Sequence, residues 1–318
     1  MRPEYHPRSH VFFDALESRI LLLDGAMGTM LQREGLSARD FGGPAHEGCN
    51  EVLVLTRPDV VAGIHRAYLR AGADILETDT FGATEVVLGE YGLAEKVEEI
   101  NLAAARLARQ AADEFTTPCK PRFVAGSMGP TTKSLSVTGG ISFGALRDAY
   151  YRQAAALVAG GVDLLLLETC QDTRNVKAAL VALDRLFEDL GFRLPVIVSC
   201  TIERSGTMLA GQTADAFWIS IAHAEPAAVG LNCATGPDLM RDHIRTLHEL
   251  AWTRVSCYPN AGLPREDGSY PETPESFASQ LAVFIRNGWL NIVGGCCGTT
   301  PEHIRKLAEV VEGATPRA

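Results

Sequence analysis

Eight apolar segments alternate along this chain with segments that have the pattern of amphipathic helices, and this alternation limits the possible folds more than any other feature. Apolar strands that alternate with helices form a parallel sheet covered by those helices. The predicted strands lie at about 20–24, 75–82 including an exit loop, 123–127, 162–167, 196–200, 228–232, 255–257 and 290–293. The predicted helices lie at about 58–71, 94–114, 143–159, 173–190, 213–223, 237–250, 274–286 and 302–312.

The number of strand–helix units favours one closed barrel over an open sheet. A chain of 318 residues has the length of two average domains, but α/β barrels often reach this length as one domain. No Gly-x-Gly-x-x-Gly sequence is present to support a dinucleotide-binding sheet. We therefore predict an α/β fold with a single-domain (β/α)8 TIM barrel over 20–313. Residues 1–19 are expected to be a flexible lead-in with a short helix around 12–18, and residues 314–318 a tail.

Composition and charge exclude several functional classes. The net charge is −10, and no run of basic residues suggests an arm that binds nucleic acid. No apolar stretch approaches the 18 residues of a membrane span, and the first residues lack the apolar core of a signal peptide. Eight cysteines, mostly at predicted strand ends, are typical of metal-binding or structural thiols in a reducing compartment. We therefore expect a cytoplasmic protein without nucleic-acid or membrane partners.

Three of the cysteines end two of the predicted strands. Cys296 and Cys297 follow the last strand between glycines, and Cys233 follows the strand at 228–232. If these strand ends are neighbours, three thiolates converge, which is three of the four ligands of a tetrahedral zinc with one position open. Three other interpretations exist: buried apolar cysteines, a strained disulfide between the adjacent pair, or a closed structural zinc completed by Cys200 or Cys257.

Two carboxylates also stand at the ends of apolar strands. Asp24 precedes a loop of small residues at 25–29, and Glu168 ends the strand at 162–167. Active sites of α/β barrels lie at this end of the strands, and a carboxylate at the end of a buried strand needs a partner. The partner is either the ammonium group of a ligand or a hydrogen-bonded loop. Small residues after a strand also allow backbone N–H groups to approach an anion.

Six phrases of the sequence together resemble one enzyme family. The phrases are LDGAMGT at 23–29, ETDTF at 77–81, GQT at 211–213, GLNC at 230–233, PNAGLP at 259–264 and GGCCGTTP at 294–301. The chain is similar over about 18–313 to the homocysteine S-methyltransferase family. Within that family it most resembles the N-terminal homocysteine-binding module of cobalamin-dependent methionine synthase. The fold of the family is a (β/α)8 barrel, which agrees with the strand count.

The resemblance implies roles for individual residues. Cys233, Cys296 and Cys297 would be the zinc ligands, and the zinc-bound homocysteine thiolate would attack a methyl donor to form methionine. Asp24 and Glu168 would face the amino group of homocysteine, and the backbone of Gly25 and Ala26 would face its carboxylate. The full set of residues expected to bind substrate is Asp24, Gly25, Ala26, Thr78, Glu168 and Asn232. Asp79 departs from the asparagine more common in the family and is given no direct role.

The resemblance leaves the methyl donor open. Methylcobalamin carried by a separate domain or partner protein is the first expectation, because nothing in this chain resembles a cobalamin-binding segment. A folate domain or partner would belong to the same arrangement. The alternative is a free-standing enzyme that uses S-methylmethionine or betaine. A second alternative is a non-catalytic zinc-containing scaffold, in which a fourth protein ligand would close the metal site.

Overall fold

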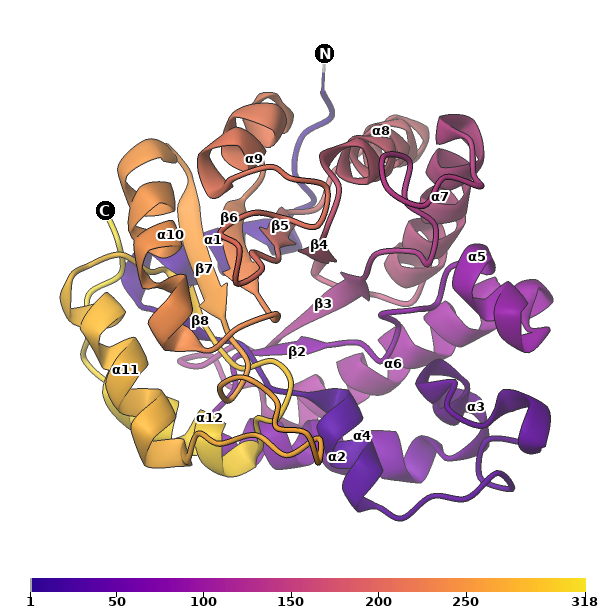
Figure 1. Ribbon diagram of the computed structural model, residues 1–318, viewed down its shortest axis with the longest axis horizontal. Coiled ribbons are helices and arrows are strands. Elements are labelled where there is room, and N and C mark those ends of the chain that lie inside the picture. The colour runs from indigo at the N-terminus through magenta and orange to yellow at the C-terminus, as the bar shows by residue number, and fades with distance from the viewer. Residues whose placement is uncertain (1) are drawn as a thin grey trace.

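The structure is a (β/α)8 barrel, as the sequence predicts. The computed structural model describes residues 2–318, in which eight parallel strands form one sheet and the helices surround it (Figure 1). The sheet order is β1-β8-β7-β6-β5-β4-β3-β2, and a bridge between Leu23 and Ile75 joins its two ends. The strands are β1 (Leu21–Leu22), β2 (Ile75–Glu77), β3 (Phe123–Met128), β4 (Leu164–Cys170), β5 (Val196–Cys200), β6 (Ala228–Asn232), β7 (Arg254–Tyr258) and β8 (Ile292–Val293).

The long helices begin and end close to the predicted residues. They are α4 (Pro58–Ala71), α6 (Val97–Phe115), α7 (Phe143–Ala159), α8 (Thr173–Leu190), α9 (Ala214–Ile221), α10 (Pro237–Leu250), α11 (Pro274–Arg286) and α12 (Pro301–Val311). Proline in the first turn and glycine after the last residue delimit α4, as expected from their backbone preferences. Three shorter helices lie outside the predicted ones: α2 (Met27–Arg33), α3 (Leu53–Thr56) and α5 (Glu85–Leu88).

Side chains alternate along each strand between the barrel interior and the surrounding helices. The interior cluster contains small, branched and aromatic side chains, and a larger cluster fills the space between the sheet and the helices. On β4, for example, Leu164 and Leu166 point inward while Leu165 and Leu167 pack under the helices. Because both faces of each strand are buried, the strands are continuous apolar runs in the sequence.

The N-terminal segment closes the bottom of the barrel. Helix α1 (Arg8–Ser18) begins four residues before the expected start of a short helix at about 12. Phe12 and Leu16 lie one helical turn apart, are almost fully buried and belong to the interior cluster. The expectation of a flexible lead-in is therefore wrong for this helix, which is part of the barrel core.

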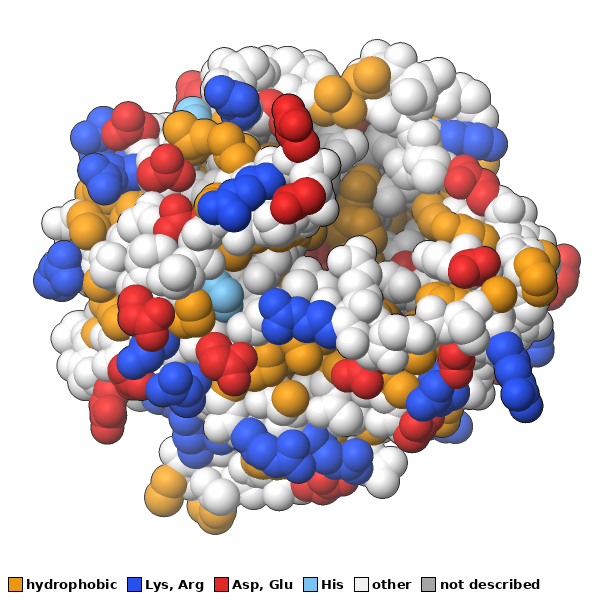
Figure 2. Space-filling view, turned by 60° about the horizontal axis from the view of Figure 1, so that its bottom comes forward, with side chains coloured by type: hydrophobic (Ala, Val, Ile, Leu, Met, Phe, Trp, Pro, Cys, Tyr) orange, Lys and Arg blue, Asp and Glu red, His pale blue; other side chains and the backbone are white. Residues whose placement is uncertain are grey.

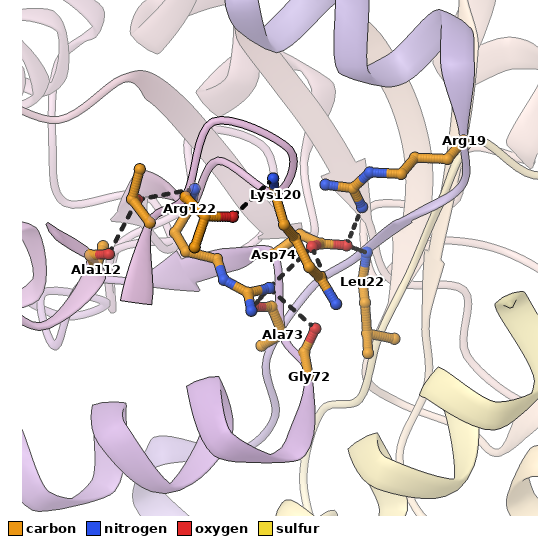
Figure 3. A network of polar contacts seen from close by, with 10 residues as sticks. Arg19, Leu22, Gly72, Ala73, Asp74, Ala112, Lys120 and Arg122 are labelled. Carbon is orange, nitrogen blue, oxygen red and sulfur yellow. Dashed lines mark hydrogen bonds and ion pairs between the residues drawn. The ribbon is translucent and has the colours of Figure 1, made fainter. Parts of the chain in front are cut away.

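A buried aspartate fastens the bottoms of three strands together (Figure 3). Asp74 accepts a hydrogen bond from the Leu22 backbone N–H at 3.0 Å and pairs with Arg19 at 2.5 Å and Arg122 at 3.0 Å. Removing one partner of such a buried pair costs about 3–5 kcal/mol in general. Asp163 and Asn291 accept from backbone N–H groups of β3 and β7 in the same way. These contacts hold the end of the barrel opposite the candidate site.

None of the helices between residues 2 and 318 is long and apolar enough to cross a membrane.

Candidate active site

Polar side chains replace the apolar interior at the C-terminal ends of the strands. Each of these side chains occupies the next inward position after the interior cluster: Glu77 lies two residues after Ile75, and Glu168 two residues after Leu166. The inward polar layer consists of Glu77, Ser127, Glu168, Ser199 and Asn232. This end of a (β/α)8 barrel is where active sites form.

The structure brings the three predicted cysteines together. Cys233 follows β6 and Cys296 and Cys297 follow β8, and their sulfur atoms all lie within 4.8 Å of one another. The Sγ atoms of Cys233 and Cys297 are 3.8 Å apart. A tetrahedral zinc with Zn–S bonds of about 2.3 Å requires its sulfur ligands to lie roughly 3.8 Å apart. The geometry therefore fits a zinc ion with three cysteine ligands.

Residues in and around the cysteine cluster have unusual backbone conformations. Cys233 and Ala234 both have a φ of 59°, and Thr169 on β4 has a φ of 55°. Three of the four non-glycine residues with positive φ among the described residues thus lie around the cysteine cluster, where strain is typical of functional sites. Gly298 has a φ of +81°, and a Cβ there would lie 2.2 Å from the Tyr270 ring. Only glycine fits this turn after the cysteine pair.

The thiols of the cluster share protons unequally. Hydrogen bonds with Cys233 and Cys296 lower the pKa of Cys297 to about 3, and contacts with Cys233 and Cys297 raise the pKa of Cys296 well above its usual value. The thiolate form of Cys297 is therefore favoured even without a bound cation. A metal ion favours the thiolate form of all its cysteine ligands.

Cys200 and Cys257 do not complete a closed metal site. Both are fully buried in the cluster between the sheet and the helices, and Cys257 Sγ lies 3.9 Å from Met240 Sδ. Within residues 2–318, the group of side chains placed to hold a metal ion contains the three cysteines and no fourth cysteine, histidine or carboxylate.

A cavity of about 240 Å³ lies beside the cysteines. It is lined by Cys233, Cys296 and Cys297 and by most of the residues predicted to bind substrate: Asp24, Gly25, Ala26, Thr78 and Glu168. Figure 2 shows a hollow near the middle of one face of the molecule. The Lys and Arg side chains of this face lie on the surface around the hollow.

Two buried carboxyl groups, Asp24 and Glu168, and the half-buried Glu77 meet in this cavity. Asp24 is 2% exposed and accepts a hydrogen bond from the Glu77 backbone N–H at 3.1 Å, but its Oδ1 has no partner. Glu168 is 3% exposed and accepts from the Ser127 hydroxyl. Burial raises the pKa of Glu168 to about 7 and the pKa values of Asp24 and Glu77 well above their usual range. A cationic ligand would favour the ionised form of all three.

Two of the residues predicted to bind substrate make hydrogen bonds to other residues of the protein. Asn232 is fully buried, is not among the residues that line the cavity, and accepts hydrogen bonds from the Thr169 N–H at 2.9 Å and the Ser199 hydroxyl at 2.7 Å. It therefore fixes the unusual backbone of Thr169. Thr78 lines the cavity, but its hydroxyl accepts from the Ser127 N–H at 3.0 Å.

The loop after β1 offers fewer free backbone groups than the sequence suggests. Gly25 and Ala26 line the cavity, but the Ala26 N–H already donates to the Thr299 hydroxyl at 3.2 Å. A Cβ on Gly25 would lie 2.7 Å from that same hydroxyl oxygen, so the loop packs tightly against the turn that carries the cysteines.

The sequence interpretation missed several residues of the cavity. Glu77 lines the cavity and belongs to the 77–81 motif, and its place two residues after Ile75 is the signal that indicates an inward side chain. Further lining residues come from the irregular section before α4 and the loop after β2: Asn50, Glu51, Asp79 and Phe81. No periodic pattern marks residues in such loops.

Known proteins provide a comparison for this site. The sequence model of the family described as homocysteine S-methyltransferase matches residues 21–311. The oxidized form of the homocysteine methyltransferase MmuM from Escherichia coli is 24% identical, with a TM-score of 0.75 over 96% of this chain and 99% of that chain. The metallated form of the same enzyme is 24% identical, with a TM-score of 0.76 over 95% of this chain and 99% of that chain. At this identity, these two structures support the barrel fold.

Proposed function

Because this chain belongs to the homocysteine S-methyltransferase family, we propose that it converts homocysteine to methionine with a zinc ion held by Cys233, Cys296 and Cys297. The observation that carries this proposal is the convergence of three cysteine sulfurs and the carboxyl groups of Asp24, Glu77 and Glu168 on one cavity. The sulfurs suit a metal that binds a thiol, and the carboxyl groups suit the ammonium group of an amino acid.

The bound zinc would supply a Lewis acid that keeps the substrate thiol deprotonated near neutral pH. The residues of the chain would bind and position the substrate. Asp24 and Glu168, with Glu77 beside them, would hold the substrate ammonium and thereby place the substrate sulfur next to the three cysteines. Asn232 would position Thr169 and the end of β4 without touching the substrate.

The methyl donor belongs to one of two chemical classes. Similarity to the methionine synthase module favours methylcobalamin delivered by a corrinoid domain or partner protein, with a folate domain or protein to remethylate it. A sulfonium or quaternary ammonium compound would instead make the chain a self-sufficient enzyme. The two classes differ in charge and size at the mouth of the cavity.

Methionine formation tests the proposal. Zinc-loaded protein is supplied with homocysteine and each donor in turn, and methionine is measured by mass spectrometry. We expect methionine with at least one donor class and its loss after treatment with a chelator. If no donor yields methionine while homocysteine still binds, the chain is a binding or scaffold module, and the proposal is wrong.

A further inference from the structure

One buried hydroxyl group joins the loop that follows Asp24 to the turn that carries Cys296 and Cys297. The hydroxyl belongs to Thr299, which is fully buried. Its Oγ1 donates a hydrogen bond to the Cys296 carbonyl oxygen at 2.7 Å and accepts one from the Ala26 backbone N–H at 3.2 Å. Because a hydroxyl group can donate and accept at the same time, Thr299 links a predicted metal ligand to the substrate side of the cavity.

Two glycines provide the space for this hydroxyl group. A Cβ on Gly25 would lie 2.7 Å from Thr299 Oγ1, and a Cβ on Gly295 would lie 2.5 Å from the same atom. Neither glycine is among those with a positive φ, so the close approach of the two segments, and not the backbone conformation, requires glycine here. A side chain at either position would displace the hydroxyl group from its two partners.

Further hydrogen bonds connect the same two segments. The Gly295 N–H donates to the Asp24 carbonyl oxygen at 3.1 Å. The hydroxyl of Tyr68, which is fully buried on α4, lies 3.1 Å from the Ala26 carbonyl oxygen and 3.3 Å from the Thr299 carbonyl oxygen. These contacts end at Asp24, whose Oδ1 has no hydrogen-bond partner within residues 2–318 and is free for a substrate group.

A connection of this kind allows two ligands to influence each other without touching. A metal ion bound by Cys296 and Cys297 would restrict the turn that carries them. An ammonium group bound by Asp24 would restrict the loop after β1. Because Thr299 holds the two segments together, ordering one of them reduces the entropy cost of ordering the other.

We infer that Thr299 is a positioning residue that couples zinc binding at the cysteines to recognition of the substrate ammonium group by Asp24. This inference rests on the proposed function of the site. Coupling between two ligands is reciprocal. Zinc should therefore raise the affinity for an amino acid, and the amino acid should raise the affinity for zinc by the same factor. Typical coupling between sites lies at about fivefold or above.

The test uses 2-aminobutyrate, which has the ammonium and carboxylate groups of homocysteine but no thiol. Its affinity for the zinc-free and the zinc-loaded protein is measured by ligand-observed NMR. We expect zinc to tighten binding about fivefold in the wild-type protein and less than about twofold in Thr299→Val. Valine keeps the shape of the side chain and removes both hydrogen bonds. Thr299→Ser, which keeps the hydroxyl group, should show the wild-type factor.

Controls separate the hydroxyl group from other effects of zinc. Any direct interaction between zinc and 2-aminobutyrate would persist in Thr299→Val, so the difference between the two proteins isolates the hydroxyl. Thr246→Val is the matched control, because the Thr246 hydroxyl donates within α10 to the Asp242 carbonyl oxygen. Chelator competition with and without 2-aminobutyrate measures the reciprocal change in zinc affinity.

A second variant carries the test if Thr299→Val does not fold. Tyr68→Phe removes the hydroxyl group that contacts Ala26 and Thr299, and it should also lower the coupling factor. Circular dichroism of both variants establishes that the barrel is folded.

The inference is wrong if zinc has no effect on 2-aminobutyrate binding in the wild-type protein, or has the same effect in Thr299→Val. A residue with only a structural role would weaken 2-aminobutyrate binding equally with and without zinc. Titration of the wild-type protein with zinc and homocysteine distinguishes this failure from that of the proposed function. If both bind and the coupling is absent, only the role of Thr299 is wrong. If neither binds, the proposed function fails first.

Discussion

Replacing Cys297 with alanine is expected to remove stoichiometric zinc and to abolish methionine formation. Cys297 Sγ lies 3.8 Å from Cys233 Sγ, and no fourth protein ligand among residues 2–318 is placed to compensate for its loss. Even residues that only support a metal ligand change affinity by 10–100-fold, so loss of a ligand should weaken zinc binding by at least about 100-fold. Metal content per chain, measured by plasma mass spectrometry after dialysis, checks this directly.

The matched control for this variant is Cys119→Ala. Cys119 is an exposed free cysteine far from the cluster in sequence, so this change removes one thiol and should leave the zinc content at one per chain. Circular dichroism of both variants establishes that the barrel is folded. Zinc retained at one per chain in Cys297→Ala would rule out the assigned ligand set.

Replacing Glu168 with glutamine is expected to weaken homocysteine binding by about 10–100-fold while zinc stays bound. Glu168 is 3% exposed in the cavity, and no basic side chain lines the cavity to pair with it. A hydrogen bond between charged groups contributes about 1.5–3 kcal/mol, which corresponds to this range of affinity. Glutamine keeps the size of the side chain and can still accept from the Ser127 hydroxyl. Calorimetric titration with homocysteine measures the change.

Glu188→Gln is the control, because Glu188 is an exposed residue of α8 outside the cavity. It should bind homocysteine with unchanged affinity. An unchanged affinity in Glu168→Gln would mean that Glu168 only clamps the loop through Ser127.

Much of the barrel could be predicted because both of its faces have regular patterns. Continuous apolar runs indicate the strands, and proline and glycine mark helix ends, as at Pro58 and Gly72. The role of α1 could not be predicted because no local pattern shows that Phe12 and Leu16 fill the lower end of the barrel interior. The position of α1 in the barrel depends on contacts between residues that are distant in sequence.

The residues of the candidate site that directly follow strands could be predicted from the sequence. Cys233 follows β6 and Cys296 and Cys297 follow β8, and although β7 lies between these strands, their ends bring the three sulfurs together at one end of the barrel. Side-chain direction could not be read from the motif alone: Asn232 turns to the Thr169 backbone, whereas Glu77 faces the cavity. Glu51 and Asp79 come from irregular segments, where no hydrophobic periodicity indicates the direction of a side chain.

We propose that the metal site is open and takes the substrate thiol as a thiolate. Homocysteine binding to the zinc-loaded protein should therefore release a proton from its thiol. The carboxyl groups of Asp24, Glu77 and Glu168 in the cavity have raised pKa values, so a bound ammonium group would release further protons from them. Homoserine has the same ammonium group and nearly the same shape, but a far less acidic hydroxyl. It controls for this contribution.

Calorimetry in two buffers of different ionisation enthalpy measures proton release for both compounds. We expect homocysteine to release about one proton more per site than homoserine and to bind more tightly. Equal proton release and equal affinity for the two compounds would contradict an open metal site.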